Sequence, residues 1–422
     1  MPRTHDTAAG MNAAVAGPSH MFDRSHRDFL LLWLGGTVSW IGNWMLVIAL
    51  PTDVYHLTGS ALATGAMFIA QTLPSVLVGA LAGVWVDRWD RKRAMVVSDI
   101  TRTVVFLPIL LVHTQTAVWV VYAAVRVEAT VAQFFNPAQA ALLPRVVGEG
   151  GLLAANARVA WGAQLALLVG PALGGILYGR YGFPPVLLLD CASFLASGLL
   201  VALVRTDGSP LPSPGRSAST PPHLWVTIWR ELIEGLRLVG RERVIRGLFI
   251  ATGLLWCALG LYYVLFVIWV GTVLHAKADA YGWLLAATGL GRFGGSLLMG
   301  RVNRALSPRT VLALSGVGTG LAFIAVINIP ILPVDLVLRV LGDIPAAILF
   351  IGLQTAVQQA VSDSHRGRVF GALGTTNGLM MLGGMAIASL CGDRLGVVPL
   401  LNLAGGFYVA SGIAAFVLLK EG

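Results

Sequence analysis

Long runs of apolar residues alternate with short polar breaks along almost the whole chain. Each run is about 20 residues or longer, the length that an α-helix needs to cross the hydrocarbon core of a bilayer. The pattern predicts twelve membrane-spanning helices, at residues 29–51, 61–86, 94–113, 117–137, 154–178, 184–204, 245–270, 280–299, 310–329, 333–356, 369–390 and 397–419. We therefore expect an all-α polytopic membrane protein.

One break between the runs is long, and it separates six predicted helices from six others. Residues 207–223 are rich in Pro and Ser, which is typical of a linker without regular structure. Apolar residues then recur at helical spacing over 225–239 and predict an amphipathic helix, lying either on the inner leaflet or against cytoplasmic loops. The predicted units are a cytoplasmic tail (1–28), a first bundle (29–204), the linker with its helix (205–244) and a second bundle (245–419).

Composition and charge support a membrane location and define an orientation. The 422 residues are 56% hydrophobic and 12% charged, about half the charged fraction of soluble domains. The net charge of +9 comes from basic residues gathered in every second connector, and only Arg180, Lys277 and Arg394 fall in the others. This asymmetry predicts that both termini are cytoplasmic. It also argues against a nucleic-acid partner, which would need one basic face.

The most charged connector is GVWVDRWDRKR, residues 83–93. It resembles the loop G-x-x-x-D-R-x-G-R-K/R between the second and third helices of the major facilitator superfamily, with Asp90 in place of the second glycine. The matching residues are Gly83, Asp87, Arg88, Arg91 and Lys92. Four other stretches, at 134–144, 155–162, 187–194 and 366–371, resemble the drug/proton antiporter branch of that family, which includes macrolide and siderophore exporters.

The resemblance implies a fold of two six-helix bundles and a gating role for this loop. Its basic residues are explained by orientation alone, but a carboxylate gains nothing from the positive-inside rule. By resemblance, Asp87 caps the N-terminus of the eleventh helix near Arg368, where free amides and the helix dipole favour an anion. The contact would stabilise the outward-open state. The alternative is that Asp87 is simply a solvated loop residue.

The fifth predicted helix contains GPALGG, residues 170–175, which resembles a motif of the efflux branches. Gly170, Pro171, Gly174 and Gly175 match, whereas Ala157 and Ala166 replace further glycines of that pattern. Close helix packing explains the small residues without any role in coupling, so both interpretations stay open.

Charged residues inside the predicted helices indicate function, because charge in a bilayer is costly. Asp99 and Arg102 lie three residues apart, and Arg339 and Asp343 four apart, so each pair shares one helix face and could neutralise itself. The position of Asp99 and Arg102 near the charged connector favours a gate network.

The fourth predicted helix carries Arg126 and Glu128, which cannot face each other and each need another partner. By resemblance, Arg126 matches a cavity-facing arginine linked to proton transfer. Arg102, on the neighbouring predicted helix, lies at a depth from which it can reach Glu128. Glu128 and Asp343 are the predicted proton-coupling carboxylates, one in each half, with structural pairing as the alternative. Asp190 and Arg292 also lie near mid-membrane, with no partner predicted.

Neutral polar and aromatic residues at similar depths are the candidates for contacting a substrate. They are Asn43, Gln71, Gln133, Gln354 and Asn377, with Trp44, Phe135, Tyr262 and Phe266 as stacking rings. Each of them alone is also explained by helix packing.

Enzyme, metal and nucleotide signals are weak. GLGRFG, residues 289–294, has the dinucleotide-binding spacing but no preceding strand. No lysine follows a glycine, which excludes the P-loop pattern, and no His pair has helical metal-site spacing. Cys191, Cys257 and Cys391 fall in apolar runs and predict buried thiols. We expect no enzyme activity, no cofactor and no bound metal.

These features predict a monomeric secondary transporter in the cell membrane that exports a small amphiphilic compound, driven by proton entry and alternating access. Uptake or facilitated diffusion of a metabolite is the first alternative, and a membrane sensor that does not transport is the second. The strong preference for Arg over Lys favours a prokaryotic source. The sequence does not identify the compound.

Overall fold

The computed structural model describes residues 18–86, 88–209, 242–361 and 366–418. At residues 18–25, 79–84, 149, 150, 278 and 366–368 it describes the backbone alone. The predicted amphipathic helix (225–239) and Asp87 lie outside the described residues, so both stay predictions.

The first half of the chain forms one helical bundle. Its elements are α1 (Pro18–Thr58), α2 (Ala61–Val86), α3 (Arg91–Phe106), two short 3-10 turns (Leu107–Leu111 and Gln115–Ala117), α4 (Val118–Tyr181) and α5 (Phe183–Ala202). Within the bundle α1 packs against α4 and α5, α2 against α4, and α3 against α4 and α5. Asp90 begins α3 as its N-cap, since its carboxylate accepts a hydrogen bond from the Arg93 amide at 2.9 Å.

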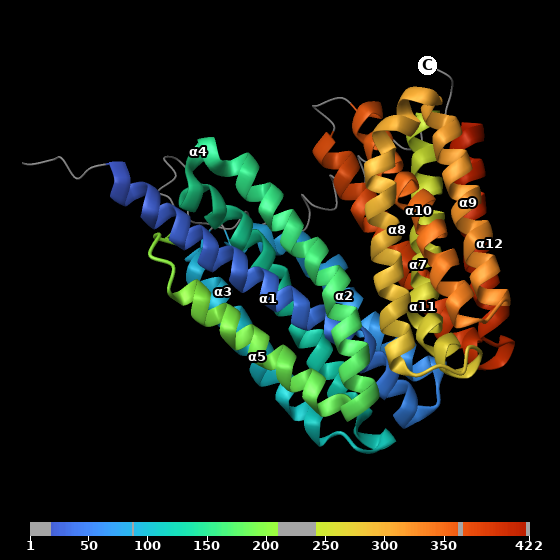
Figure 1. Cartoon of the computed structure of the whole chain (residues 1–422), viewed down its shortest axis with the longest axis horizontal. Helices are drawn as coiled ribbons and strands as arrows, with labels where there is room; N and C mark the ends of the chain where they lie inside the picture. The colour runs from blue at the N-terminus through green and yellow to red at the C-terminus, as the bar shows by residue number, and fades with distance from the viewer. Residues whose placement is uncertain (1–17, 87, 210–241, 362–365, 419–422) are drawn as a thin grey trace, which may run out of the picture.

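The long element α4 contains two membrane spans. The chain reverses at Gly148, whose φ of 67° is accessible to glycine at little cost, and Figure 1 shows the two arms diverging from this point. The sequence predicts a connector at 138–153, but most of it continues the two helices. Leu142, Leu143 and Val146 are buried against α1, α2 and α3, and this packing extends the first arm beyond its predicted end.

The second half forms the other bundle. Its helices are α7 (Arg243–Thr272), α8 (Ala278–Ala305), α9 (Pro308–Asn328), α10 (Leu332–Ala360), α11 (Arg366–Leu395) and α12 (Val397–Leu418). Here α7 packs against α11 and α12, α10 against α8 and α9, and α9 against α12. With α4 counted as two spans, the fold is the predicted pair of six-helix bundles.

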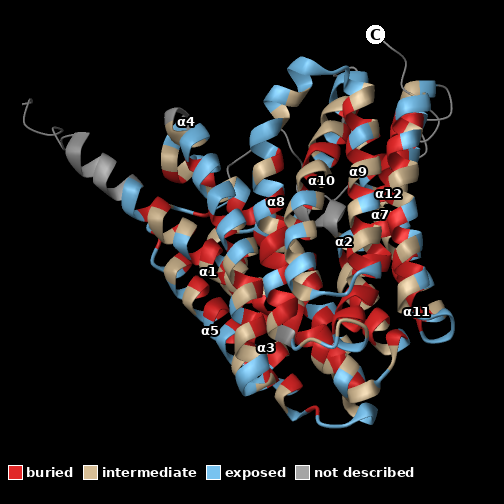
Figure 2. Cartoon of the chain, turned by 45° about the vertical axis from the view of Figure 1, so that its right-hand side comes forward, coloured by how far each residue is buried: buried red, intermediate tan, exposed pale blue. Residues whose placement is uncertain are grey.

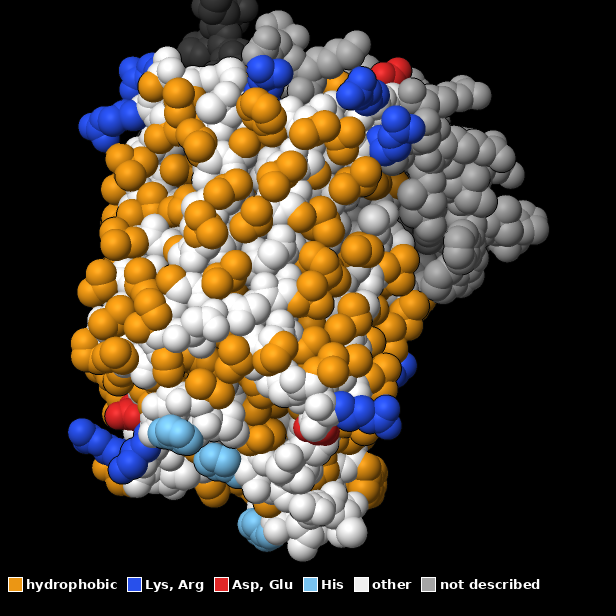
Figure 3. Space-filling model, turned by 90° about the vertical axis from the view of Figure 1, so that its right-hand side faces the viewer, with side chains coloured by type: hydrophobic (Ala, Val, Ile, Leu, Met, Phe, Trp, Pro, Cys, Tyr) orange, Lys and Arg blue, Asp and Glu red, His pale blue; other side chains and the backbone are white. Residues whose placement is uncertain are grey.

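Eleven segments of the described chain are long and apolar enough to cross a membrane. The twelfth helix, α8, has 28 residues but is less apolar, because its sequence includes Asp279, Arg292, Arg301 and Arg304. Figure 3 shows the outward side of the second bundle, where an orange apolar band separates basic residues at the two ends. This surface matches a bilayer with its two polar boundaries, so the protein is a multi-pass membrane protein.

The two bundles meet at one end of the molecule and diverge toward the end where α1 begins and α12 ends, which we call the terminal face (Figures 1 and 2). Contacts between the halves are made by α2 with α11 and by α4 with α8. We call this contact region the closed seam. It brings residues 60–76 against 378–393, and 168–179 against 279–289.

Candidate functional site

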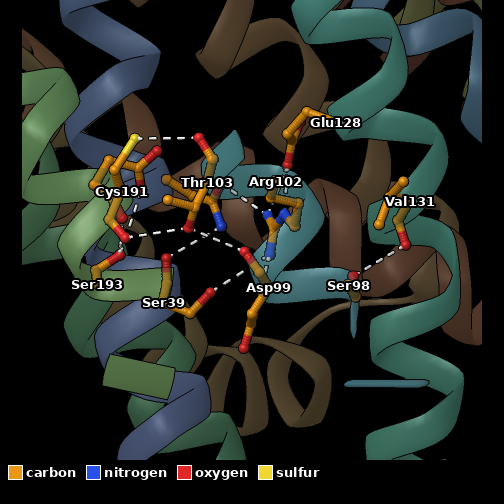
Figure 4. Close-up of polar contacts among 11 residues, drawn as sticks. Ser39, Ser98, Asp99, Arg102, Thr103, Glu128, Val131, Cys191 and Ser193 are labelled. Carbon is orange, nitrogen blue, oxygen red and sulfur yellow. Dashed lines mark hydrogen bonds and ion pairs between the residues drawn. The ribbon is translucent and has the colours of Figure 1, made fainter. Parts of the chain in front are cut away.

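A cluster of buried charged residues, the N-half cluster, lies inside the first bundle and is centred on Arg102 of α3 (Figure 4). The Arg102 guanidinium donates to Glu128 Oε1 through Nε at 2.9 Å and through Nη2 at 2.7 Å. Nη2 also donates to Asn43 Oδ1 at 3.0 Å. Glu128 is therefore the main ionic partner of Arg102, as their similar depth in the sequence suggests.

Two further carboxyl groups complete the N-half cluster. Asp99 Oδ1 lies 3.6 Å from Arg102 Nη1, and Asp190 of α5 lies within the electrostatic reach of the same guanidinium. Both aspartates have no exposed surface, and Glu128 is only 5% exposed. Three buried carboxyl groups thus share one arginine. The predicted Asp99–Arg102 pair forms, but it does not neutralise the cluster.

A small pocket opens beside this cluster. Asn43, Gln71 and Glu128 line it together with apolar residues of α1, α2 and α3. Its volume of about 20 Å³ is enough for one water molecule. The pocket brings two predicted substrate-contact residues and one predicted coupling carboxylate to a single point, and it gives water a place beside Glu128.

The second bundle contains its own group of charged residues, the C-half cluster, centred on Asp343 of α10. Asp343 Oδ1 lies 3.4 Å from Arg292 Nε of α8, and its Oδ2 lies 3.8 Å from Arg339 Nη1 one turn away. Asp335, one turn in the other direction from Arg339, is fully buried. Two arginines face two aspartates, so this cluster is balanced in charge. The structure supplies the partner of Arg292 that the sequence did not predict.

Aromatic rings surround Arg339. Its guanidinium carbon lies 5.0, 4.2 and 5.5 Å from the ring centres of Tyr262, Phe266 and Phe323. Such cation–π contacts stabilise an arginine away from water. In this structure the Tyr262 and Phe266 rings, predicted as substrate-stacking residues, are both buried around Arg339. Substrate stacking by either ring stays a prediction. Phe135 is likewise buried, in the core of the first bundle.

The remaining predicted site residues lie apart from the two clusters. Arg126 is exposed on α4, whereas Glu128 is turned inward. Gln133 donates to the Ala129 carbonyl of its own helix at 3.0 Å. Asn377 of α11 is partly buried. Substrate contact by Gln133 and Asn377, and proton transfer through Arg126, stay predictions.

The basic connector contacts the end of the first bundle and the beginning of the linker. Arg91 Nη1 donates to the Ser209 carbonyl at 2.9 Å, and Lys92 Nζ to the Val204 carbonyl at 2.6 Å. Gly83 lies near the end of α2, and the side chain of Arg368 is not described. The gating contact of Asp87 with α11 therefore stays a prediction.

The GPALGG motif packs against both halves at the closed seam. A side chain at Gly174 would meet the Met45 backbone of α1 at 2.5 Å, and one at Gly170 would meet Trp44 and the Ile41 carbonyl. On its other side, Pro171 and Gly175 lie against Gly282 of α8. The motif thus allows three helices to approach closely, which gives it a packing role at the seam.

The same seam contains a carboxylate that sequence reasoning missed. Asp393, at the end of α11, accepts a hydrogen bond from the Ala61 amide at 2.8 Å and another from the Ser60 hydroxyl at 3.0 Å. It thus caps the N-terminus of α2 from the opposite half. The predicted contact of Asp87 joins the other ends of these same two helices. A search of the sequence for a second carboxylate at the opposite end of this helix pair could therefore have found Asp393.

Among the described residues, no group of three or more His, Cys, Asp or Glu side chains is arranged to hold a metal ion. The acidic groups of both clusters instead have arginines as their charged partners. Chemically, buried carboxyl groups beside arginines are able to bind and release protons and to exchange partners when the surrounding helices move.

Comparison with known proteins agrees with this architecture. The profile of the Major Facilitator Superfamily matches residues 32–264 and 248–421. The multidrug efflux pump Tap of Mycolicibacterium fortuitum is 29% identical, over 87% of this chain and 91% of Tap. Macrolide efflux protein A of Streptococcus pyogenes is 25% identical, over 91% and 94% of the two chains. The enterobactin exporter EntS of Citrobacter koseri is 25% identical, over 90% and 91%.

The crystal structure of the nucleoside transporter NupG superposes with a TM-score of 0.73, covering 94% of this chain and all of NupG. The sequence identity of 14% limits that comparison to the fold. The helix architecture, the charged clusters inside the bundles and the full-length profile match agree with one another. The chain is a membrane transporter that belongs to the Major Facilitator Superfamily.

Proposed function

We propose that the protein exports small amphiphilic compounds across the cell membrane in exchange for protons. The observation that carries export is the similarity along nearly the whole chain to three bacterial proteins named for efflux. Their names mention several drugs, macrolides and a siderophore, so the shared property is outward transport of medium-sized organic molecules. The structure supports a proton as the exchanged ion, because both bundles hold buried acids at their centres.

In this proposal the terminal face is cytoplasmic, since the basic connectors lie on that side. The structure then represents a state that is open to the cytoplasm and closed at the seam. Export requires the seam to open while the terminal ends approach, a rocking of two bundles around a central site. The predicted gating contact of Asp87 and the cap that Asp393 forms at the seam would stabilise the two alternate states in turn.

The test uses everted membrane vesicles that hold a proton gradient, acid inside, reported by a fluorescent pH dye. Erythromycin, tetracycline, ethidium and a catecholate siderophore are added one at a time. We expect proton release from the vesicles with at least one compound, and none in vesicles without the protein. Glu128→Gln and Asp343→Asn are the paired variants, and Asp207→Asn, in the exposed linker, is the matched control.

A compound that moves without proton release would contradict antiport. It would favour facilitated diffusion, the first alternative function. Uptake is distinguished by repeating the assay in right-side-out vesicles, where an exporter does not accumulate its substrate. A chain that moves none of the compounds, although folded and present, would support the sensor alternative.

A further inference from the structure

We propose that Asp190 is the carboxyl group that carries the exchanged proton, an inference that rests on the proposed antiport. The argument begins with the charges of the N-half cluster. If Asp99, Glu128 and Asp190 were all ionised, one guanidinium would face three negative charges in a buried site. Burial of an unpaired carboxylate is costly enough that such a group takes up a proton instead. At least one of the three acids is then neutral.

Hydrogen bonding distinguishes the three acids. Glu128 receives two short bonds from Arg102, which is the geometry of an ionised carboxylate. Asp99 has the next guanidinium nitrogen at 3.6 Å. Both Asp99 oxygens and Asp190 Oδ2 are buried without a hydrogen-bond partner, but among the described residues Asp190 forms no ion pair. Asp190 is therefore the acid that Arg102 compensates least.

The nearest polar side chain to Asp190 also favours its neutral form. Ser193 donates its hydroxyl hydrogen to the Asp190 backbone carbonyl at 2.7 Å. The same hydroxyl is the donor to Asp190 Oδ1, at the longer distance of 3.4 Å. Its single hydrogen is already engaged by the carbonyl, so Oδ1 receives only a long, shared hydrogen bond. Little therefore stabilises an ionised Asp190.

Close packing holds the Asp190 side chain in place, and charged residues on two neighbouring helices act on it. On α1 the group meets Gly42, where any side chain would collide with Asp190 Oδ1 and with the Ser193 hydroxyl. The charged groups that act on it are Asp99 and Arg102 of α3 and Glu128 of α4. Arg102 lies between Glu128 of α4 and helix α5, which carries Asp190. It is bonded to Glu128 on one side, and on the other its guanidinium carbon lies 4.0 Å from the centre of the Phe194 ring of α5.

The exchange step follows from this arrangement. When the bundles rearrange and Arg102 turns from Glu128 toward α5, the Asp190 O–H bond breaks, its proton leaves to water, and the new carboxylate pairs with Arg102. The Glu128 carboxylate that loses the arginine is then solvated by water in its pocket, so it is no longer a buried, uncompensated charge. Glu128 lines the pocket that is large enough for one water molecule, and it takes part as the group that gives up the arginine. The reverse step reloads Asp190 from the other side of the membrane.

Infrared spectroscopy of the purified full-length protein tests the protonation directly, through the carbonyl stretch of a protonated carboxyl group. We expect a band at neutral pH that is lost in Asp190→Asn and retained in the Asp207→Asn control. Ser193→Ala should keep the band and shift both its frequency and the pH at which it disappears. A wild-type spectrum that Asp190→Asn leaves unchanged would overturn the proposal, whatever the transport assays show.

Proteoliposomes that transport one of the tested drugs supply the second measurement. In Asp190→Asn, accumulation driven by a pH gradient should fall to the level of protein-free liposomes, while exchange of labelled for unlabelled drug persists. Loss of both activities in a folded variant, or loss of neither, would contradict a proton-carrying role. If the wild-type protein moves no drug, the proposed antiport is contradicted. The infrared band assigned to Asp190 then still shows, by its dependence on pH, whether this residue binds and releases a proton.

Discussion

The two halves of the protein hold buried charge in different ways. The N-half cluster has three carboxyl groups around one arginine, and hydroxyl and amide side chains surround them. The C-half cluster has two arginines and two aspartates, and one of its arginines is enclosed by aromatic rings. The first arrangement has an excess of acid, whereas the second is neutral when every group is ionised.

This difference suggests a division of labour between the bundles. An excess of buried acid favours bound protons, and the number of those protons can change as pairing changes. A balanced cluster around cation–π contacts keeps its charges through the same range of pH. We therefore expect proton coupling to depend mainly on the first bundle, and the charged residues of the second bundle to act chiefly through structure.

The largest predicted effect is a difference in the free energy of unfolding between variants of the two central arginines, Arg102 and Arg339. Arg102→Met leaves three buried acids without a counter-charge and should lower the free energy of unfolding by about 3–5 kcal/mol. Arg339→Met leaves Asp343 paired with Arg292 and places an apolar side chain among aromatic rings, but it removes the positive charge that acts on the buried Asp335. The loss should therefore be smaller than for Arg102→Met, about 2–3 kcal/mol. Thermal unfolding of the two purified variants measures the contrast, and equal losses would remove it.

Removing an acid from the balanced cluster should have the next largest effect. In Asp343→Asn, Arg339 and Arg292 lose the carboxylate that they share, which should cost about 2–3 kcal/mol. Arg292 limits the loss, because its side chain is 47% exposed and so is less enclosed by protein than Arg339. Unfolding measured between pH 5 and pH 8 should show the same loss at each pH. A loss confined to the alkaline end would instead assign a titrating proton to this cluster.

The closed seam holds the two halves together, and Asp393 contributes two of its hydrogen bonds. Asp393→Ala removes the cap of α2 and should shift the equilibrium toward seam opening by about 0.5–2 kcal/mol, a roughly 2- to 30-fold change in population. Spin labels at the exposed positions Leu62 and Leu395 report the seam distance. Ser60→Ala, which removes one of the two bonds, should give a smaller shift. An unchanged distance distribution in Asp393→Ala would show that the cap does not hold the seam.

The smallest effect is expected where an acid is in excess. Asp99→Asn reduces the imbalance around Arg102, and its effect on the free energy of unfolding should lie within about 1 kcal/mol of zero. The contrast in sign and size with Asp343→Asn is the sharpest test of the comparison. A loss from Asp99→Asn as large as that from Asp343→Asn would show that charge balance does not distinguish the halves.

Much of the architecture was predictable from the sequence, because one physical rule dominates it. Backbone groups in a bilayer must bond within their own helix, so each apolar run of sufficient length becomes a span. Eleven of the spans follow directly from that rule, and α8, which is less apolar, completes the second bundle. The cost of charge inside a bilayer likewise identified Arg102, Glu128, Arg339 and Asp343 as unusual before any contact was known.

Partners and pairing required the tertiary structure. Helical spacing showed that Asp99 and Arg102 share a face, but the stronger partner of Arg102 is Glu128 on another helix. The buried position of Asp190 and the enclosure of Arg339 by aromatic rings depend on how four or five helices cross.

The seam contact of Asp393 joins residues more than 330 positions apart. The reason is physical: hydropathy is a property of each segment, whereas charge balance and gating depend on distances between segments. Helix packing alone sets those distances.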